Sequence, residues 1–297
     1  MMAGFIMAGR IQAAIFVVLS TLISLLFPPL IVFNNAAIAL ITLRKGWQQG
    51  IVYTLLASVT LLIISAALDQ QASRGFLAGL ANWLPMVVIA SALALTKSWS
   101  KTLQLILITA TAGVLLFHFM QPDAAAYWKP VLEQFKPLLK QGYQLSDAKI
   151  DESINDVAKW MTGTFAAALA LISILSLIIA RNWQAVLFNP GGFGEEFRQI
   201  NLGKQAAIAV LVGIAIAVLT MNQLVVELIM VGIAVFMFQG LALAHALVKK
   251  HNLNKAWLIG LYLMMFLLLI QMIVLLATFG IIDTFVDFRR KKPGNPN

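Results

Sequence analysis

The chain has 297 residues, of which 61% are hydrophobic and 11% are charged, and its formal net charge is +9. Globular domains are about 45–50% apolar and about 25% charged, so this composition excludes an ordinary soluble protein. The absence of cysteine excludes disulfides, thiol nucleophiles and thiolate metal sites. Nucleic-acid binding is not expected, because anionic lipid and the positive-inside rule explain the positive charge better.

Nine apolar stretches follow one another along the chain. They are Ile11–Phe27, Leu30–Leu43, Gly46–Leu68, Gly75–Thr96, Thr102–Met120, Met161–Ala180, Gln205–Leu219, Gln223–Val248 and Ala256–Ile282. Only Glu227 places a charge inside them, and most approach the about 20 residues that a helix needs to cross a bilayer. The sequence therefore predicts an all-α, polytopic transmembrane helical bundle with about 8–9 membrane helices.

The distribution of lysine and arginine predicts the orientation. Arg10 precedes an apolar stretch that is too long for a signal peptide, so we expect an uncleaved first membrane helix and a cytoplasmic N-terminus. Most basic residues then fall in cytoplasmic loops. Nine crossings, however, would place the basic tail Arg289-Arg290-Lys291-Lys292 outside, and Leu30–Leu43 is short for a full crossing, so the side of the tail stays open.

Two polar segments separate the predicted membrane helices. Gln121–Trp160 falls outside and contains an amphipathic helix, which would either rest on lipid or cover the bundle as a lid. The second segment, residues 182–204, is predicted to be cytoplasmic. The predicted domains are therefore a six-helix bundle (1–181, including 121–160), a cytoplasmic loop (182–204) and a three-helix membrane segment (205–297).

The cytoplasmic loop combines turn chemistry with exposed aromatic residues. Asn189, Pro190 and Gly191 favour a tight turn, after which a short helix is expected. This loop is either simple punctuation or a docking site for a cytoplasmic protein. The residues of the docking hypothesis are Phe188, Asn189, Pro190, Gly191, Phe193, Glu196, Phe197 and Arg198.

Polar side chains at membrane depth suggest a ligand site. Such groups are costly in lipid, and each is more often an interhelical hydrogen bond than a ligand contact. Five residues toward the outer half could line one pocket for a small polar or zwitterionic ligand: Asn34, Asn35, Asn82, Trp83 and His118. The loop Gln121–Trp160 would cover this pocket.

Enzyme and metal signatures are missing from the sequence. His118, His245 and His251 are far apart, and neither His-Glu-x-x-His nor Gly-x-Ser-x-Gly occurs. We therefore expect neither an enzyme, nor a metal site, nor a cofactor.

Short motifs in the C-terminal half resemble a known family. They are Phe-Asn-Pro-x-Gly-Phe followed by Glu, an aromatic residue and Arg (Phe188 to Arg198), Gln239-Gly240, and Gly280 with Asp283, followed by Asp287-Phe288-Arg289. This pattern resembles the YybS-like family of uncharacterised bacterial integral membrane proteins. The resemblance implies a multi-pass protein of the bacterial cytoplasmic (inner) membrane.

The resemblance also implies a function class. The first six helices of that family are similar to the substrate-capture (S) subunits of energy-coupling-factor transporters, which bind a small molecule and a coupling partner in the membrane. The Ala-x-x-x-Ala coupling motif of those subunits is absent from the first apolar stretch, and Gly9-x-x-x-Ala13 at its start is the nearest approach. Two hypotheses follow: transport-associated capture of a small molecule, or a non-transporting membrane scaffold that recruits a membrane or cytoplasmic protein through residues 188–204.

Overall fold

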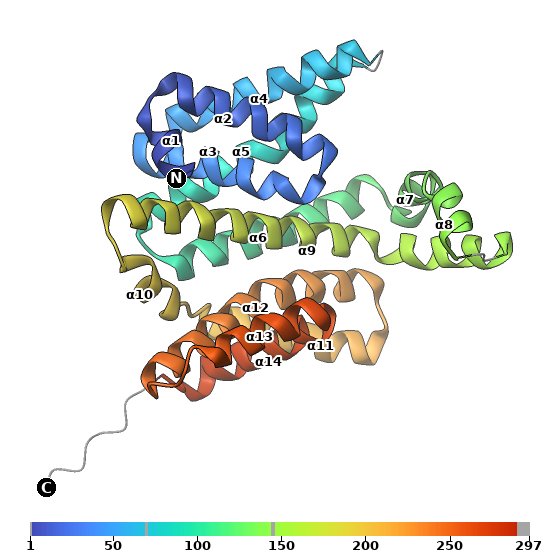
Figure 1. The fold of residues 1–297 in the computed structure, drawn as a ribbon. Coiled ribbons are helices and arrows are strands. Elements are labelled where there is room, and N and C mark those ends of the chain that lie inside the picture. The colour runs from blue at the N-terminus through green and yellow to red at the C-terminus, as the bar shows by residue number, and fades with distance from the viewer. Residues whose placement is uncertain (1, 69–70, 144–145, 290–297) are drawn as a thin grey trace, which may run out of the picture. The chain divides into compact units, whose positions relative to one another are not determined.

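The structure, a computed structural model, describes residues 2–68, 71–143 and 146–289. Every regular element in these ranges is helical, which confirms the all-α class (Figure 1). The elements are α1 (Met2–Ala8), α2 (Arg10–Leu26), the 3-10 turn η1 (Pro28–Leu30), α3 (Ile31–Lys45), α4 (Trp47–Ala67), α5 (Ala72–Thr96), α6 (Trp99–Met120), α7 (Ala124–Glu133), α8 (Lys136–Tyr143), α9 (Asp147–Phe188), α10 (Gly192–Arg198), α11 (Gly203–Thr220), α12 (Gln223–Lys250), α13 (Ala256–Leu267) and α14 (Leu269–Val286).

Seven of the described helices are long and apolar enough to cross a membrane, and they make this a plausible polytopic helical membrane protein. The number is below the predicted 8–9 because two apolar stretches form helices that are too short, and the last stretch contributes only its second half. α2 has 17 residues and α3 has 15, and the last stretch divides at Leu268 into α13 with 12 residues and α14 with 18. Leu268 adopts φ −129° and ψ 51°, which no helix residue adopts, so the helix breaks there without a glycine or proline.

The chain forms two compact units that differ from the predicted domains. Unit 1 comprises residues 1–103 and 172–199, and unit 2 comprises residues 104–171 and 200–297. The predicted boundaries at 181 and 204 followed polarity along the sequence, whereas these units follow contacts. α6 and α9 contribute residues to both units.

Unit 1 is built on close contacts between α3, α4 and α5. A Cβ atom on Gly79 of α5 would lie 2.9 Å from the Cα atom of Ser58 on α4, so the absence of a side chain allows α5 to press against the backbone of α4. Trp83, one turn further along α5, is 1% exposed. α3 buries residues 34–42 without interruption, so its polar residues Asn34 and Asn35 lie inside unit 1.

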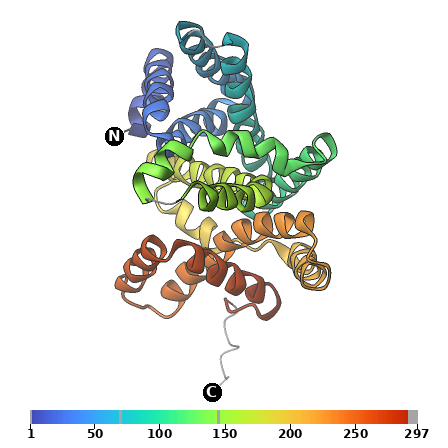
Figure 2. The same ribbon diagram turned by 90° about the vertical axis from the view of Figure 1, so that its right-hand side faces the viewer.

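Unit 2 is built around α12, which has α11 and α14 as neighbours. α11 and α12 form a hairpin whose turn is Met221 in the left-handed conformation, at φ 50° (Figure 2). On the α14 side, a Cβ on Gly280 would lie 2.5 Å from the carbonyl oxygen of Phe236. A Cβ on Gly240 would overlap the carbonyl oxygen of Leu276. Glycines on both helices therefore permit a backbone-to-backbone crossing.

The C-terminal end of α14 lies beside the C-terminal end of α12. Lys250 Nζ donates a hydrogen bond to the carbonyl oxygen of Phe288 at 2.9 Å, while Leu276 meets Gly240 further back. Residues near the C-terminal end of α14 thus contact residues near the C-terminal end of α12, so the two helices run in the same direction. α13, which joins them along the chain, therefore runs in the opposite direction. Its 12 residues span about 18 Å.

The predicted outer segment is helical over most of its length. Its second half forms the start of α9, a single helix of 42 residues that continues through Phe188. α8 is attached to this helix by the ion pairs Lys136–Asp151 and Lys140–Asp147. The hydrogen bond to Asp151 raises the pKa of Lys136, and the hydrogen bond to Lys140 lowers the pKa of Asp147.

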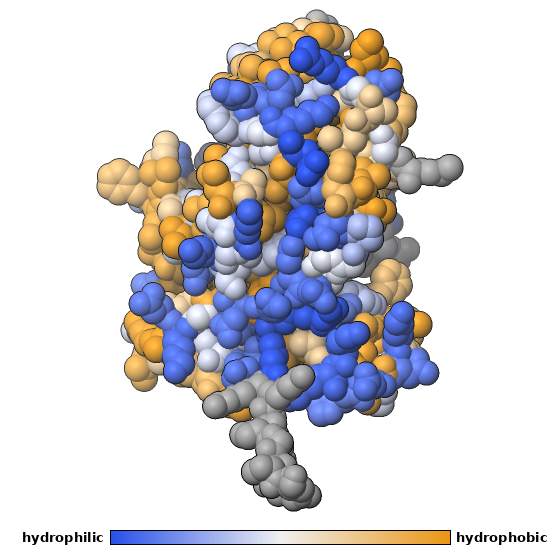
Figure 3. Space-filling view, turned by 90° about the vertical axis from the view of Figure 1, so that its left-hand side faces the viewer, coloured by the Kyte–Doolittle hydropathy of each residue, from blue (hydrophilic) through white to orange (hydrophobic). Residues whose placement is uncertain are grey.

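Much of the surface is apolar, as a membrane protein requires. Large hydrophobic side chains such as Phe119 and Phe266, each 84% exposed, lie on the outside of the helices. Figure 3 shows hydrophobic residues alternating with hydrophilic ones over one face of the molecule. Exposed apolar area of this extent is unfavourable in water and ordinary in contact with lipid.

Candidate ligand-binding site

Asn34 joins α3 to α2 inside unit 1. Its side chain is fully buried, and its Nδ2 lies 2.9 Å from the Val17 carbonyl oxygen, 2.9 Å from Ser20 Oγ and 2.7 Å from Thr21 Oγ1. Val17, Ser20 and Thr21 lie at i, i+3 and i+4 and so form one face of α2. The amide of Asn34 is therefore fixed in a single orientation.

Asn35 points to α5 instead. Its Oδ1 accepts a hydrogen bond of 3.2 Å from Nδ2 of Asn82, and Trp83 follows directly on the same helix. The structure thus places Asn34, Asn35, Asn82 and Trp83, called the polar layer below, in unit 1, and it brings Asn35 and Asn82 into contact. Within the described residues, Asn34 Oδ1 and Trp83 Nε1 are buried without a hydrogen-bond partner. Such orphaned atoms are uncommon, and they often mark a site where a ligand or water binds.

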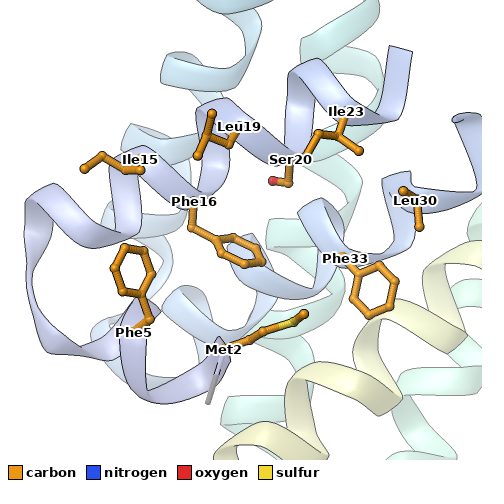
Figure 4. A pocket seen from close by; sticks show the side chains of 9 residues that line it. All are labelled: Met2, Phe5, Ile15, Phe16, Leu19, Ser20, Ile23, Leu30 and Phe33. Carbon is orange, nitrogen blue, oxygen red and sulfur yellow. The ribbon is translucent and has the colours of Figure 1, made fainter. Parts of the chain in front are cut away.

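An apolar cavity that is half open to the surface of unit 1 lies next to this polar layer. It has a volume of about 370 Å³ and is walled by Met2, Phe5, Ile15, Phe16, Leu19, Ser20, Ile23, Leu30 and Phe33 (Figure 4). None of the five predicted pocket residues is among these. Ser20 is the polar member of the lining, and its hydroxyl accepts a hydrogen bond from Asn34. The hydrogen bond between Asn34 and Ser20 therefore connects the polar layer to the lining of the cavity.

Trp183 supports the aromatic wall of this cavity from behind. Its ring stacks against Phe33 with a centroid distance of 6.4 Å and meets Phe16 edge-on at 6.3 Å. Aromatic pairs in these arrangements contribute about 0.5–1.5 kcal/mol beyond their buried area. Two side chains of the cavity wall are thus held in place by α9.

His118, the fifth predicted pocket residue, belongs to unit 2. Its Nε2 lies 2.6 Å from Oε2 of Glu227, which is fully buried. Glu227 is not among the residues predicted to line the pocket, although it is the one charge within the nine apolar stretches. That isolation was the signal that could have found it. A common pocket for all five residues stays a prediction.

The predicted docking residues are largely engaged within unit 1. Arg181 forms an ion pair with Glu196, and Trp99 Nε1 donates to the same carboxylate at 3.4 Å. Phe193 packs against Trp99 and Phe197, with centroid distances of 5.9 and 5.7 Å. These contacts hold α10 against its own unit.

The loop before α10 has the predicted turn. Asn189, Pro190 and Gly191 are exposed between α9 and α10, and Gly191 adopts φ 87°, which favours glycine. Phe188, also exposed, lies beneath the guanidinium of Arg44 at 3.8 Å. Arg198, the last residue of α10, is half-buried. The exposed part of the predicted docking surface is therefore Phe188–Gly191.

The remaining family-like positions converge in unit 2. Gln239 is fully buried, its Oε1 accepts the backbone N–H of Leu202 at 2.7 Å, and its Nε2 donates to the Gly280 carbonyl at 2.8 Å. Asp283 pairs with Arg289 at 2.8 Å. These contacts, with the Gly240–Gly280 crossing, form a clasp at one end of unit 2.

The clasp also fixes the last described residues. Arg289 donates to the carbonyl oxygen of Ile200 at 2.7 Å, so the chain after α14 returns to the start of α11. Asp287 ends α14 in the left-handed conformation at φ 49°. The sequence spacing also predicts that Asp287 pairs with Arg290 or Lys291, and this pairing lies outside the described residues.

Replacing Gln239 by methionine should destabilise unit 2 by about 1–3 kcal/mol. Methionine fills a similar volume but leaves the N–H of Leu202 and the carbonyl of Gly280 without this partner. The matched control is Gln271→Met on α14, where the side chain is exposed and a change within about 0.5 kcal/mol is expected. Denaturant unfolding of the purified protein measures both, and equal effects would contradict the clasp.

No group of three His, Asp or Glu side chains within residues 2–68, 71–143 and 146–289 could hold a metal ion. Comparisons with protein-family models, with curated proteins and with solved structures find no match to this chain.

Proposed function

We propose that this multi-pass membrane protein captures a small, mainly apolar molecule in unit 1, as a transport-associated binding protein does. The cavity of about 370 Å³ carries this proposal. Its volume lies within the range of about 300–1,000 Å³ that is typical of ligand sites. Its lining, apolar apart from one hydroxyl, also matches the composition of such sites.

The lining specifies the ligand more closely than the sequence did. A polar or zwitterionic molecule would leave several groups unpaired against Phe5, Phe16 and Phe33, at a cost of several kcal/mol. A molecule with an apolar body and one hydrogen-bonding group matches the wall, because Ser20 supplies a single hydroxyl. Asn34 holds that hydroxyl from behind. We therefore favour a single-chain amphiphile over the polar ligand predicted from the sequence.

The resemblance to the YybS-like family, and through it to substrate-capture subunits, remains part of this proposal. It supports a bacterial cytoplasmic membrane protein with a binding rather than an enzymatic role. The absence of Ala-x-x-x-Ala from the first apolar stretch argues against coupling to a standard transport module.

Binding of stearic acid to the purified protein in nanodiscs tests the proposal. Ser20→Phe fills the cavity and removes the hydroxyl, so it should weaken binding by at least about tenfold, measured by native mass spectrometry. Ile11→Phe is the control, because Ile11 lies on the same helix, is 72% exposed and does not line the cavity. Equal binding by the wild type and both variants would overturn the proposal.

The geometry of unit 2 also supports a revised topology. α13 runs away from the C-terminal end of α12 and α14 runs back toward it, so the chain after α14 lies beside Lys250 and Ile200. We infer that Arg289, the last described residue, is on the same side of the membrane as the start of α11 and the end of α12. Because cationic segments resist translocation, this placement agrees with the positive-inside rule.

Labelling of single cysteines in this cysteine-free chain checks the topology. Cysteines at Lys97, Lys255 and Asn297 should react from the cytoplasmic side with an impermeant maleimide, and one at Ser146 should react from the other side. If the cysteine at position 297 reacted from the same side as the cysteine at position 146, the revised topology would be contradicted. If the cysteine at position 97 reacted from that side, the orientation as a whole would be contradicted.

The scaffold hypothesis has weaker support. Phe197 is 7% exposed, and Glu196 is already paired, so a partner could reach few of the predicted docking residues without displacing α10. A partner that binds at Phe188–Gly191 would be lost on Phe188→Ala but kept on Ile11→Phe, which distinguishes the two hypotheses.

A further inference from the structure

Glu227 lies one turn into α12, and its carboxylate is held from two sides. Nε2 of His118, near the end of α6, is 2.6 Å from Oε2, and Nε2 of Gln223 is 3.3 Å from Oε1. Gln223 also donates to the carbonyl of Lys159 on α9. Three helices of unit 2 thus meet at one carboxyl group.

α9 closes the site tightly. A Cβ on Gly163 would lie 2.6 Å from both the Cα and the Cβ of Glu227, so α9 lies directly against the backbone of α12. Glu227 itself is 0% exposed, while the His118 side chain is 17% exposed. The imidazole is therefore the group that connects the buried carboxylate with the surface.

Among the described residues, neither His118 nor Glu227 forms an ion pair with a third side chain. On α9, Asp156 and Lys159 are exposed and pair with one another at 2.9 Å. On α7, Asp123 caps its own helix by accepting from the N–H of Ala126, and Lys129 is exposed. α11 carries Lys204 and α12 carries Lys249 and Lys250, which lie at the other ends of those helices.

A buried carboxylate with an imidazole partner is suited to exchange protons. A charge within apolar helices is costly and is a functional-site hypothesis by default. Histidine is the side chain whose charge ordinarily changes between about pH 5 and 8. Two titrating groups in direct contact take up protons as a pair.

We propose that His118 and Glu227 form an intramembrane proton-binding site, which is reached through His118. In its neutral form the pair shares one proton between imidazole and carboxylate. A second proton, taken from water at His118, ends on Glu227 and leaves an imidazolium facing a carboxylic acid. The ionic attraction is then lost, and the C-terminal end of α6 is released from α12. This site is independent of the cavity in unit 1.

Infrared difference spectroscopy of the full chain in nanodiscs tests proton binding directly. Lowering the pH should produce a carboxylic-acid C=O band that Glu227→Gln removes and His118→Gln shifts to a different pH. Glu227→Gln keeps the size of the side chain and leaves no charge in the core, so it should fold. Glu152→Gln, at an exposed position on α9, is the matched control and should keep the band. Absence of a band that depends on Glu227 would overturn the proposal.

Hydrogen–deuterium exchange tests the structural consequence. At low pH, after correction for the intrinsic exchange rate, residues 114–120 of the wild type should lose protection by at least about tenfold. In Glu227→Gln, which mimics the protonated acid, this loss should be present at every pH. The release of α6 would be overturned if the protection of residues 114–120 in the wild type did not change with pH. It would also be overturned if this protection changed equally in Glu227→Gln.

Discussion

Replacing Gly240 by leucine should prevent unit 2 from folding. A Cβ at this position would overlap the carbonyl oxygen of Leu276, and that atom belongs to a helix backbone that cannot move aside alone. Overpacking of a flexible core costs about 1–3 kcal/mol, and a clash with a fixed backbone exceeds this range. We expect a destabilisation above about 3 kcal/mol, which is a large share of the stability of an ordinary domain.

Gly260 on α13 provides the matched control. A Cβ there meets nothing within 4 Å, so Gly260→Leu should leave the yield of folded protein nearly unchanged. Fluorescence-detected size-exclusion chromatography, followed by denaturant unfolding, compares the two variants. A normal yield and stability for Gly240→Leu would show that α12 and α14 do not cross as described.

Removing one partner of the His118–Glu227 pair is the second large effect. His118→Leu leaves Glu227 buried with Gln223 as its remaining side-chain contact, and an uncompensated buried charge of this kind costs about 3–5 kcal/mol. The double variant His118→Leu/Glu227→Met removes both groups and should recover most of that loss, because buried ion pairs and apolar residues of similar volume are often equally stable.

A double-mutant cycle measures this interaction by denaturant unfolding at neutral pH. The stability of the double variant should exceed that of His118→Leu by at least about 2 kcal/mol. Additive effects of the two single replacements would mean that the contact of 2.6 Å contributes nothing.

The sequence allowed the class of fold and many helix boundaries to be predicted. The long apolar stretches became long helices because backbone groups in an apolar segment are satisfied within a helix. Asn189, Pro190 and Gly191 correctly predicted a turn, since glycine tolerates φ 87°. The break at Leu268 could not be predicted, because it lies in a run of leucines without a helix-breaking residue.

The pairings between residues far apart in the chain could not be predicted from the sequence. His118 and Glu227 are 109 positions apart, and no local pattern indicates that α6 and α12 meet there. The polar residues of α3 and α5 could be recognised in the sequence as candidates, but their partners depend on helix rotation. The cavity is lined by ordinary apolar residues of α1, α2, η1 and α3, which carry no signal of their own.

Quenching of Trp183 by dibrominated stearic acid tests the binding of an apolar molecule in unit 1 most directly. Trp183 contacts Phe16 and Phe33 of the cavity wall, so a bromine atom in the cavity would lie close to its ring. Saturable quenching is expected in nanodiscs. Unbrominated stearic acid should reverse this quenching, and Trp183→Phe and Ser20→Phe should each abolish it. Quenching that is non-saturable, or that is the same in the wild type and both variants, would contradict it.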